Sequence, residues 1–351
     1  MPDDATVPGP AGPPELDLLR LHYPGLRWRS AQRVTEGWDH VVLLLAGCTG
    51  PDARGHSELV FRFPDDKYAP LLESEIAALD LLAPRVEAAI PRYSHREYSS
   101  VGHGGAVSGT AGSGTAVFGG YPTIRGTRLT PGALGRLPRS DVTQIAGQLG
   151  ELLSELHRQD TSAPPLDRLP PAWPAEDRHH LKELATRELP SRLTAEEMRE
   201  VHGILDGLDQ LLDAPVTPVF LHGDVYSSHL FWEPGRAVST GPVSTGPVST
   251  GPVSTGPVAP GRLGVIDFAD MCLGDPAIDF AELYEYGPRF VDAVLARYLG
   301  PADDRLLDRA WDHQRLVAVY MLTDHIELGK QSWARARETF DRCRSPSRPT
   351  D

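Results

Sequence analysis

Two stretches of the sequence each combine apolar residues with a short polar loop. The first is Val219-Phe220-Leu221-His222-Gly223-Asp224-Val225-Tyr226-Ser227-Ser228-His229-Leu230-Phe231-Trp232, and the second, further along the chain, is Leu263-Gly264-Val265-Ile266-Asp267-Phe268. Each contains an apolar, partly β-branched run that is typical of a buried strand. We therefore expect Asp224, His229 and Asp267 at strand ends, where a rigid scaffold directs side chains into a cleft. Two carboxylates and an imidazole can provide one proton acceptor and two metal ligands, the minimal set for metal-assisted phosphoryl transfer.

The length and composition indicate a globular protein. The chain has 351 residues, enough for two domains or one two-lobed domain, and a hydrophobic fraction of 40%. It contains no apolar run near the roughly 18 residues needed to cross a membrane. Its acidic start, Met1-Pro2-Asp3-Asp4, differs from the basic start of a signal peptide, and its three cysteines are scattered. We therefore expect a reduced, cytoplasmic protein without a membrane partner.

The net charge of −14 restricts the classes of partner. It argues against nucleic-acid binding, because phosphate contacts need basic patches. It favours small cationic substrates, which an acidic cleft concentrates electrostatically. The alternative is that the acidity only keeps the protein soluble.

The N-terminal part has the pattern of a small β-rich lobe. Residues 1–14 are rich in proline and glycine, so we expect them to be disordered. The lobe itself is predicted over residues 15–122, with a flexible, Gly- and Ser-rich hairpin insertion at 99–115. Its expected elements are a helix over 71–82 and strands over 30–36, 41–45, 59–64, 90–93 and 116–122.

Residues 123–351 are predicted to form a larger, mainly helical lobe that begins with the two strands quoted above. Ser140 is expected to cap a helix over 141–157, and Thr194 and Glu197 have the spacing of a capping box. Further helices are expected over 280–286, 288–299, 305–322 and 333–340. The predicted fold class is therefore α+β.

A five-residue repeat, Val-Ser-Thr-Gly-Pro, occupies residues 238–257 in four copies. Units this rich in Pro, Gly, Ser and Thr cannot bury a core, so we expect a solvated segment. It lies in the turn between the two strands, within a predicted insertion over 238–260. Because loop-closure cost grows only logarithmically with length, we interpret it as a tolerated expansion rather than a ligand motif.

Several motifs together resemble the aminoglycoside phosphotransferase family, which has the protein-kinase-like two-lobed fold. They are His222-Gly223-Asp224 with His229, Ile266-Asp267-Phe268, Gly274–Phe280, Phe61–Pro64, Glu75-Ile76 and Tyr121–Gly126. The resemblance covers roughly residues 30 to 290. Glu285–Val291 and Ile326–Lys330 are similar to the branch that phosphorylates the 2″-hydroxyl of aminoglycosides. Macrolide phosphotransferases resemble the chain in having His at the position of His229.

The resemblance assigns roles to the three residues at the strand ends. Asp224 would accept or orient the proton of the attacking hydroxyl, and Asp267 would hold Mg²⁺ against the phosphates. His229 stands where most of the family has Asn. Either a neutral imidazole serves as the second metal ligand, or the substitution marks a degraded site. The resemblance also implies that His222 and Asp279 orient and brace the loop.

In the small lobe, the resemblance implies a site for ATP or GTP. Arg62 stands where relatives place a phosphate-binding Lys, and Glu75 would be its helix partner. The alternative for Arg62 is a surface residue on a strand. Gly37 marks the phosphate loop, and Gly120 and Tyr121 would bond the purine edge through their backbone.

The acceptor is predicted to be a small cationic hydroxylated molecule, with an aminoglycoside as the leading class. Carboxylates of the large lobe would pair with its ammonium groups, and the candidates are Glu282, Glu285, Asp324 and Glu327. The alternative for each is a solvated charge on a helix surface. The competing functions are a macrolide phosphotransferase, a metabolic kinase for a small amino alcohol, and a catalytically inactive kinase-like binding protein.

Overall fold

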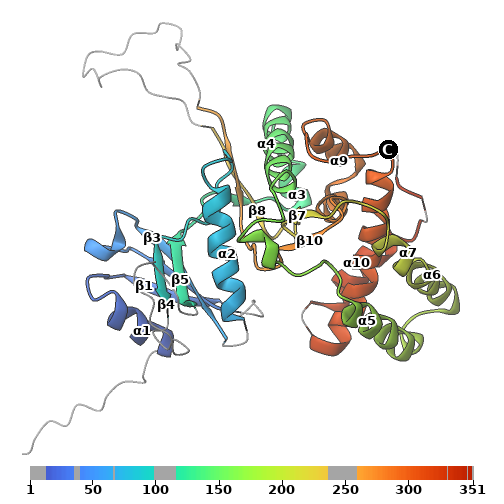
Figure 1. Cartoon of the computed structure of the whole chain (residues 1–351), viewed down its shortest axis with the longest axis horizontal. Coiled ribbons are helices and arrows are strands. Elements are labelled where there is room, and N and C mark those ends of the chain that lie inside the picture. The colour runs from blue at the N-terminus through green and yellow to red at the C-terminus, as the bar shows by residue number, and fades with distance from the viewer. Residues whose placement is uncertain are drawn as a thin grey trace, which may run out of the picture. The chain divides into compact units, whose positions relative to one another are not determined.

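The computed structural model describes residues 13–34, 40–65, 68–98, 116–235, 259–329, 331–345 and 347–349. The chain forms two compact units, one made of Met1–Asp80 and Pro91–Thr123 and the other of Leu81–Ile90 and Ile124–Asp351 (Figure 1). Gly37, the 99–115 insertion, Lys330, the four repeats and all but the last residues of the 1–14 segment lie outside the described residues.

The first unit is built on a five-stranded antiparallel sheet with the strand order β1-β2-β3-β5-β4. Its strands are β1 Ser30–Val34, β2 His40–Ala46, β3 Glu58–Pro64, β4 His95–Tyr98 and β5 Ala116–Pro122. Its helices are α1 Pro14–His22, the short 3₁₀ turn η1 Pro51–Ala53 and α2 Ala69–Leu82. Helix α2 lies against the sheet, since a Cβ at Gly119 of β5 would contact Ile76 at 3.5 Å (Figure 1).

The core of this unit combines leucine and aromatic side chains and lies around β3. Five consecutive residues of β3 are buried, because both faces of this central strand are covered. Phe61 and Phe118 are fully buried, with ring centroids 6.3 Å apart in an edge-on arrangement. Gly120 of β5 permits this packing, since a Cβ there would lie 2.4 Å from the Phe61 ring.

The strand predicted over 90–93 is wrong, because the strand in this region begins only at His95. Ala89, which belongs to the second unit, instead pairs with a strand of that unit, donating to Leu263 O at 2.7 Å and accepting from Val265 N at 2.8 Å. Pro91 follows and cannot donate to a ladder. The other strands and the helix predicted in this unit agree with the structure to within a few residues over the described ranges.

The second unit consists mainly of helices around two small antiparallel sheets. The helices are α3 Pro131–Leu134, α4 Arg139–His157, α5 Ala175–Glu188, α6 Ala195–Asp206, α7 Leu208–Leu212, α8 Ile278–Ala281, α9 Pro288–Leu295, α10 Leu306–Leu328 and α11 Trp333–Arg342, with 3₁₀ turns η2 Leu166–Arg168, η3 Leu189–Ser191 and η4 Glu282–Tyr286. The strands are β6 Thr127–Arg128, β7 Val219–Leu221, β8 Leu230–Glu233, β9 Arg262–Val265 and β10 Cys272–Gly274, in the orders β6-β8-β9 and β10-β7. The predicted α+β class is confirmed. Within the described ranges, no helix combines the length and apolar content needed to span a bilayer.

Helix α4 holds the β8–β9 hairpin through one polar face. Asp141 accepts from the Trp232 indole at 3.2 Å, Gln144 accepts from Gly261 N at 3.2 Å, and Gln148 accepts from Leu263 N at 2.8 Å. These three side chains recur at helical spacing, so they project from one side of α4.

Of the two helix N-caps predicted from the sequence, one is wrong and the other is confirmed. Ser140 is not the cap of α4, because the helix begins at Arg139, two residues earlier than predicted, and Pro138 occupies the N-cap. The fixed φ of proline suits that position, and the Ser140 hydroxyl contacts Asp141 instead. The capping box of α6 is confirmed: the Thr194 side chain accepts from Glu197 N, and the Glu197 carboxylate accepts from Thr194 N at 2.8 Å.

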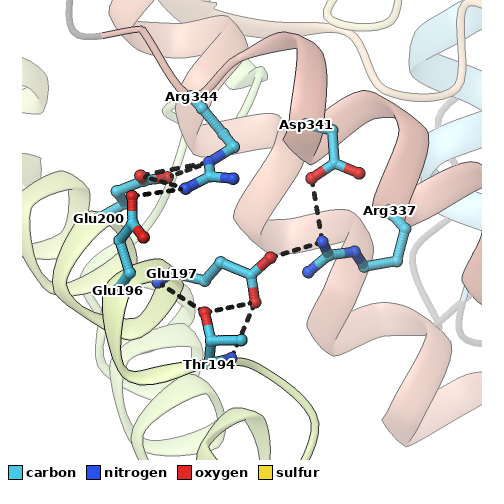
Figure 2. A network of polar contacts seen from close by, with 7 residues as sticks. All are labelled: Thr194, Glu196, Glu197, Glu200, Arg337, Asp341 and Arg344. Carbon is cyan, nitrogen blue, oxygen red and sulfur yellow. Dashed lines mark hydrogen bonds and ion pairs between the residues drawn. The ribbon is translucent and has the colours of Figure 1, made fainter.

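Helix α11 is fastened to α6 by a network of ion pairs (Figure 2). Arg337 donates to Glu197 at 2.6 Å and to Asp341 at 3.0 Å. Arg344, just beyond α11, donates to Glu200 at 2.8 Å and to Glu196 at 3.2 Å. Because the Glu197 and Arg337 side chains are only 11% and 24% exposed, this pair is better shielded than an ordinary surface ion pair.

Removing Arg337 should destabilise the protein most at neutral pH. The Arg337 guanidinium, together with the Thr194 N–H, lowers the pKa of Glu197 from its usual 4.5 to about 2. The stabilisation is therefore present above pH 4.5 and is lost as the pH falls toward 2. We expect Arg337→Met to lower the free energy of unfolding by about 1–3 kcal/mol at about pH 7 and by less at about pH 3, measured by urea unfolding.

Arg342→Met is the matched control, since Arg342 lies on the same helix in a long, exposed pair with Glu338 at 3.9 Å. Its effect should stay within about 0.5 kcal/mol at both pH values. Equal losses in the two variants, or a loss for Arg337→Met that does not depend on pH, would contradict the assignment.

Candidate active site

A tight turn after β7 places Asp224. Gly223 has a φ of 86°, and a Cβ at this position would lie 2.2 Å from the carbonyl oxygen of Asp270. Only glycine fits this close approach of two backbone segments. The chain then passes through the loop 222–229, which joins β7 to β8.

Asp267 lies just beyond β9 in a left-handed conformation with a φ of 65°. This conformation is uncommon for a residue with a Cβ, although Asp tolerates it better than most. The turn brings the Asp267 carboxylate to 3.4 Å from Nε2 of His229. The sharp reversal after β9 therefore serves to direct one carboxylate.

His229 lies between the two carboxylates and is largely buried. Its Nδ1 is 3.0 Å from the carbonyl oxygen of Asp224 and 3.2 Å from the Asp224 carboxylate. A neutral imidazole that donates from Nδ1 to the Asp224 carbonyl leaves the lone pair of Nε2 on the side of Asp267. The structure thus brings together Asp224, His229 and Asp267, as the sequence predicts.

This arrangement fits a magnesium ion that shares its coordination with phosphate. The available Nε2 of His229 and a carboxylate oxygen of Asp267 face each other. No group of three or more His, Cys, Asp or Glu side chains in the described part of the chain forms a complete metal site. Mg²⁺ typically takes only one or two protein ligands and fills its other positions with phosphate oxygens and water.

Glu282, at the start of η4, forms a hydrogen bond with Asp224. Burial raises the pKa of Asp224 to about 7, and the charge of Asp267 adds to this effect, while the Glu282 hydrogen bond opposes it. Burial and the Asp224 charge raise the pKa of Glu282 well above its usual value. The two carboxyl groups therefore share a proton near neutral pH, with Glu282 as its donor.

The other predicted acceptor residues have different surroundings. Glu285 accepts from the backbone N–H and the hydroxyl of Ser227, so it braces the loop 222–229. Asp324 is buried on α10, and Glu327 forms an exposed pair with His180 of α5 at 2.9 Å. For Glu327 the alternative of a surface charge therefore agrees with the structure.

Tyr320 of α10 was not among the site residues predicted from the sequence. Partial burial raises the pKa of Tyr320 to about 12, and the charges of Asp324, Asp270 and Asp224 add to the shift. Tyr320 therefore shares an acidic neighbourhood with Asp224. Its position four residues before Asp324 on α10 was the available signal, since residues so spaced lie on one helix face.

A buried carboxylate holds the backbone of the loop 222–229 in place. Asp279 of α8 accepts from the backbone N–H groups of His222 and Gly223, both at 2.9 Å, and pairs with Nε2 of His157 at 3.0 Å. Burial alone would raise the pKa of Asp279, but the His157 pairing and the N–H bonds hold it below its usual value. The predicted bracing role of Asp279 is confirmed.

His222 connects this loop to the segment that carries Asp267. Its Nδ1 accepts from Asp224 N, and its Nε2 donates to the carbonyl of Ile266, both at 3.2 Å. Burial lowers the pKa of His222 to about 4, so the ring is neutral at physiological pH. The ring is fully buried, in agreement with its predicted orienting role.

In the first unit, Arg62 of β3 and Glu75 of α2 form a buried ion pair. One Arg62 nitrogen lies 2.9 Å from both carboxylate oxygens of Glu75, and the Tyr93 hydroxyl donates to the same carboxylate at 2.9 Å. The alternative of a surface Arg62 is wrong, since its side chain is only 7% exposed. Gly120 and Tyr121 lie on β5, and the buried Tyr121 ring packs edge-on against Tyr93.

Together these residues define a phosphotransferase of the protein-kinase-like architecture, and comparison with known proteins agrees. Residues 30–240 and 256–318 match the phosphotransferase enzyme family, and the chain belongs to this family. The predicted family and enzyme class are thereby confirmed. No curated protein matches the chain in sequence.

Solved structures share the fold at low identity. The GDP complex of aminoglycoside 2′-phosphotransferase-IIIa is 20% identical, with a TM-score of 0.67 over 94% of this chain and 97% of that chain. Macrolide 2′-phosphotransferase MphH from Brachybacterium faecium is 19% identical, with a TM-score of 0.56 over 96% and 99%. The gentamicin complex of APH(2″)-IIa is 18% identical, with a TM-score of 0.57 over 95% of each chain.

Replacing Asp279 should loosen the loop that carries Asp224. In Asp279→Asn, the amide NH₂ replaces one of the two carboxylate oxygens that accept from the backbone N–H groups of His222 and Gly223 in the wild type. We expect the free energy of unfolding to fall by about 2–4 kcal/mol and kcat to fall about tenfold or more, because Asp224 loses its fixed position. Thermal unfolding and steady-state kinetics measure both quantities.

Asp209→Asn serves as the control, because Asp209 pairs with Lys182 on the surface at 2.7 Å. It should leave both quantities near those of the wild type. An Asp279→Asn enzyme with wild-type stability and kcat would disprove the bracing role.

Proposed function

We propose that the protein transfers the γ-phosphate of ATP or GTP to a hydroxyl group of a small cationic molecule, with an aminoglycoside as the leading acceptor. The observation that carries the proposal is the meeting of Asp224, His229 and Asp267 at the ends of two neighbouring loops. Membership of the phosphotransferase family supplies the reaction class.

Asp224 is the residue that orients the acceptor hydroxyl and receives its proton. A pKa of about 7 suits a group that must accept a proton near neutral pH. Glu282 donates a hydrogen bond to this carboxylate and holds its orientation. Since 27% of the Asp224 side chain is exposed, it remains accessible to an acceptor.

His229 and Asp267 are the proposed Mg²⁺ ligands. The ion, when bound, neutralises charge on the phosphate groups and so lowers repulsion toward the incoming hydroxyl oxygen. The protein orients His229 through the hydrogen bond from its Nδ1 to the Asp224 carbonyl. Asp224 is thereby linked to one of the two ligand positions.

Nucleotide binding is assigned to the first unit. Arg62, fixed by Glu75, supplies a guanidinium for the phosphates. Gly37, outside the described residues, stays a candidate for the phosphate loop on its sequence alone. The backbone at Tyr121 is the proposed partner of the purine edge, because the carbonyl of Gly120 already accepts from Ser94 N at 2.9 Å. Both ATP and GTP remain candidates, since similar structures contain GDP, ADP or ATP.

The acceptor assignment rests on charge. Glu282 and Glu285 lie beside the loop of Asp224, and Asp324 shares the neighbourhood of Tyr320. Carboxylates so placed attract ammonium groups, and structures of similar fold contain kanamycin or gentamicin. Glu327 would have to exchange its pairing with His180 to take part.

A macrolide is the second candidate acceptor. Trp173 and Tyr320 pack edge-on with centroids 5.7 Å apart, and Tyr320 is 41% exposed. This aromatic pair offers apolar surface, which a macrolide with its single amine would use more than an aminoglycoside. The same pair could pack against an aminoglycoside ring, so the acceptor is decided by experiment.

Incubation with ATP or GTP, Mg²⁺ and a panel of aminoglycosides and macrolides tests the function. We expect mass spectrometry to detect a singly phosphorylated aminoglycoside. Asp224→Asn should lower kcat by about 10²–10⁴-fold, because the hydroxyl loses its proton acceptor. Absence of both product and Mg²⁺-dependent nucleotide hydrolysis in the wild type would instead favour the inactive binding protein.

His229 variants test the metal assignment. His229→Ala removes one ligand and should raise the Mg²⁺ concentration needed for half-maximal activity about 10–100-fold. His229→Asn restores an oxygen ligand of the kind most relatives have, so it should approach the wild type. An unchanged Mg²⁺ requirement in His229→Ala would exclude His229 as a ligand.

A further inference from the structure

Arg335 occupies an unusual position at the start of α11. The Ser332 hydroxyl caps this helix by accepting from Arg335 N at 3.2 Å, which places Arg335 in the first turn. The first turn contains no acidic residue. A cation at the N-terminus of a helix opposes the helix dipole, so helix stability does not account for this residue.

The guanidinium of Arg335 lies over the loop that carries Asp224. Its Cζ atom is 5.6 Å from the centroid of the Tyr226 ring, within the range of a cation–π contact. The Tyr226 ring in turn meets the His229 ring edge-on, with centroids 4.5 Å apart. Arg335 therefore lies one aromatic ring away from a proposed Mg²⁺ ligand.

The positive charge of Arg335 affects the carboxyl groups that are proposed to bind the acceptor, Glu282 and Glu285. Burial raises the pKa values of Tyr226, Glu282 and Glu285, and the positive charge of Arg335 lowers all three. In the described part of the chain, its guanidinium makes no direct ion pair with a carboxylate, and the residue is exposed. The charge is thus present near the carboxylates without being fixed to one of them.

The remainder of α11 is held firmly. Arg337, two residues further along, is bound to Glu197 of α6, and Arg344 is bound to Glu200 (Figure 2). This network fixes the helix, and the exposed side chain of Arg335 lies outside the network. The start of α11 is consequently a rigid support for one positive charge beside the loop.

We propose that Arg335 is a specificity-determining residue of the acceptor site, an internal cation that competes with the acceptor's ammonium groups for the field of Glu285 and of the single negative charge that Asp224 and Glu282 share. The inference rests on the proposed function and concerns the same site. Each additional ammonium group on this side of an acceptor meets both the carboxylates and the repulsion of Arg335. The residue therefore limits how tightly polycationic acceptors bind and favours those with fewer amines there.

Three variants separate the charge from the shape of the side chain. Arg335→Met removes the charge and keeps the unbranched stem, and Arg335→Lys keeps the charge. Arg192→Met is the matched control, because Arg192 lies over the ring of Trp333, the first residue of α11, also at 5.6 Å. Steady-state kinetics with kanamycin and calorimetry with kanamycin and nucleotide give KM, kcat and Kd.

We expect Arg335→Met to lower KM and Kd for kanamycin about three- to tenfold, with the effect on KM rather than on kcat. The difference should shrink at about 0.5 M salt, where exposed charges are screened. Arg335→Lys should resemble the wild type, and Arg192→Met should not change either constant. Thermal unfolding verifies that each variant is folded.

Unchanged or raised KM and Kd in folded Arg335→Met would overturn the proposal, as would an Arg335→Lys variant that behaves like Arg335→Met. Failure of the proposed function is visible separately, in a wild type that phosphorylates no acceptor. In that case the Kd for kanamycin still decides the role of Arg335. A wild type that neither phosphorylates nor binds kanamycin overturns both.

Discussion

The buried carboxylate of Asp279 is the constraint on which the active site depends. It is 1% exposed and accepts from two backbone N–H groups of the loop 222–229 while it pairs with His157 of α4. A carboxylate so deeply buried is stable only when its oxygens are paired, so the loop, α4 and α8 must keep one arrangement. Asp224 follows Gly223 directly, so its position is fixed by the same hydrogen bonds. The position of Asp224, the proposed proton acceptor, is thus set by a buried carboxylate on α8.

Around this support, the site concentrates negative charge, which the protein partly balances with its own groups. Asp224 and Glu282 share a proton, His229 lies between Asp224 and Asp267, and Arg335 stands over Tyr226. Like charges brought so close destabilise one another unless protons or cations intervene. In the proposed function, a metal ion and the ammonium groups of an acceptor would add positive charge beside these carboxylates. Binding of cationic ligands is therefore favoured by relief of repulsion already present in the fold.

The local parts of this structure could be predicted from the sequence, and the long-range parts could not. The motifs around Asp224 and Asp267 and the capping box of α6 depend on residues a few positions apart, so their patterns are visible in the chain. The expected strand over 90–93 failed because Ala89 bonds to β9, and β6 and β10 were missed because two or three residues become strands only through distant partners. Arg335 was missed for the same reason: only the packing of α11 brings it to Tyr226.

The hairpin of β8 and β9 has the candidate site residues at one end and the repeat segment at the other, so the length of the repeat segment can vary without changing the site. His229 and Asp267 flank one end of its four paired positions, and Gly235 and Ala259 meet at the other, where a Cβ on Gly235 would lie 2.1 Å from the Ala259 carbonyl. Four strand residues span about 13 Å, so the two ends are well apart. Copies of the Val-Ser-Thr-Gly-Pro unit can be gained or lost between these fixed ends while the register of the hairpin stays the same. Natural variants that differ in repeat number should therefore be functionally silent, and the same position would accept a fused reporter domain.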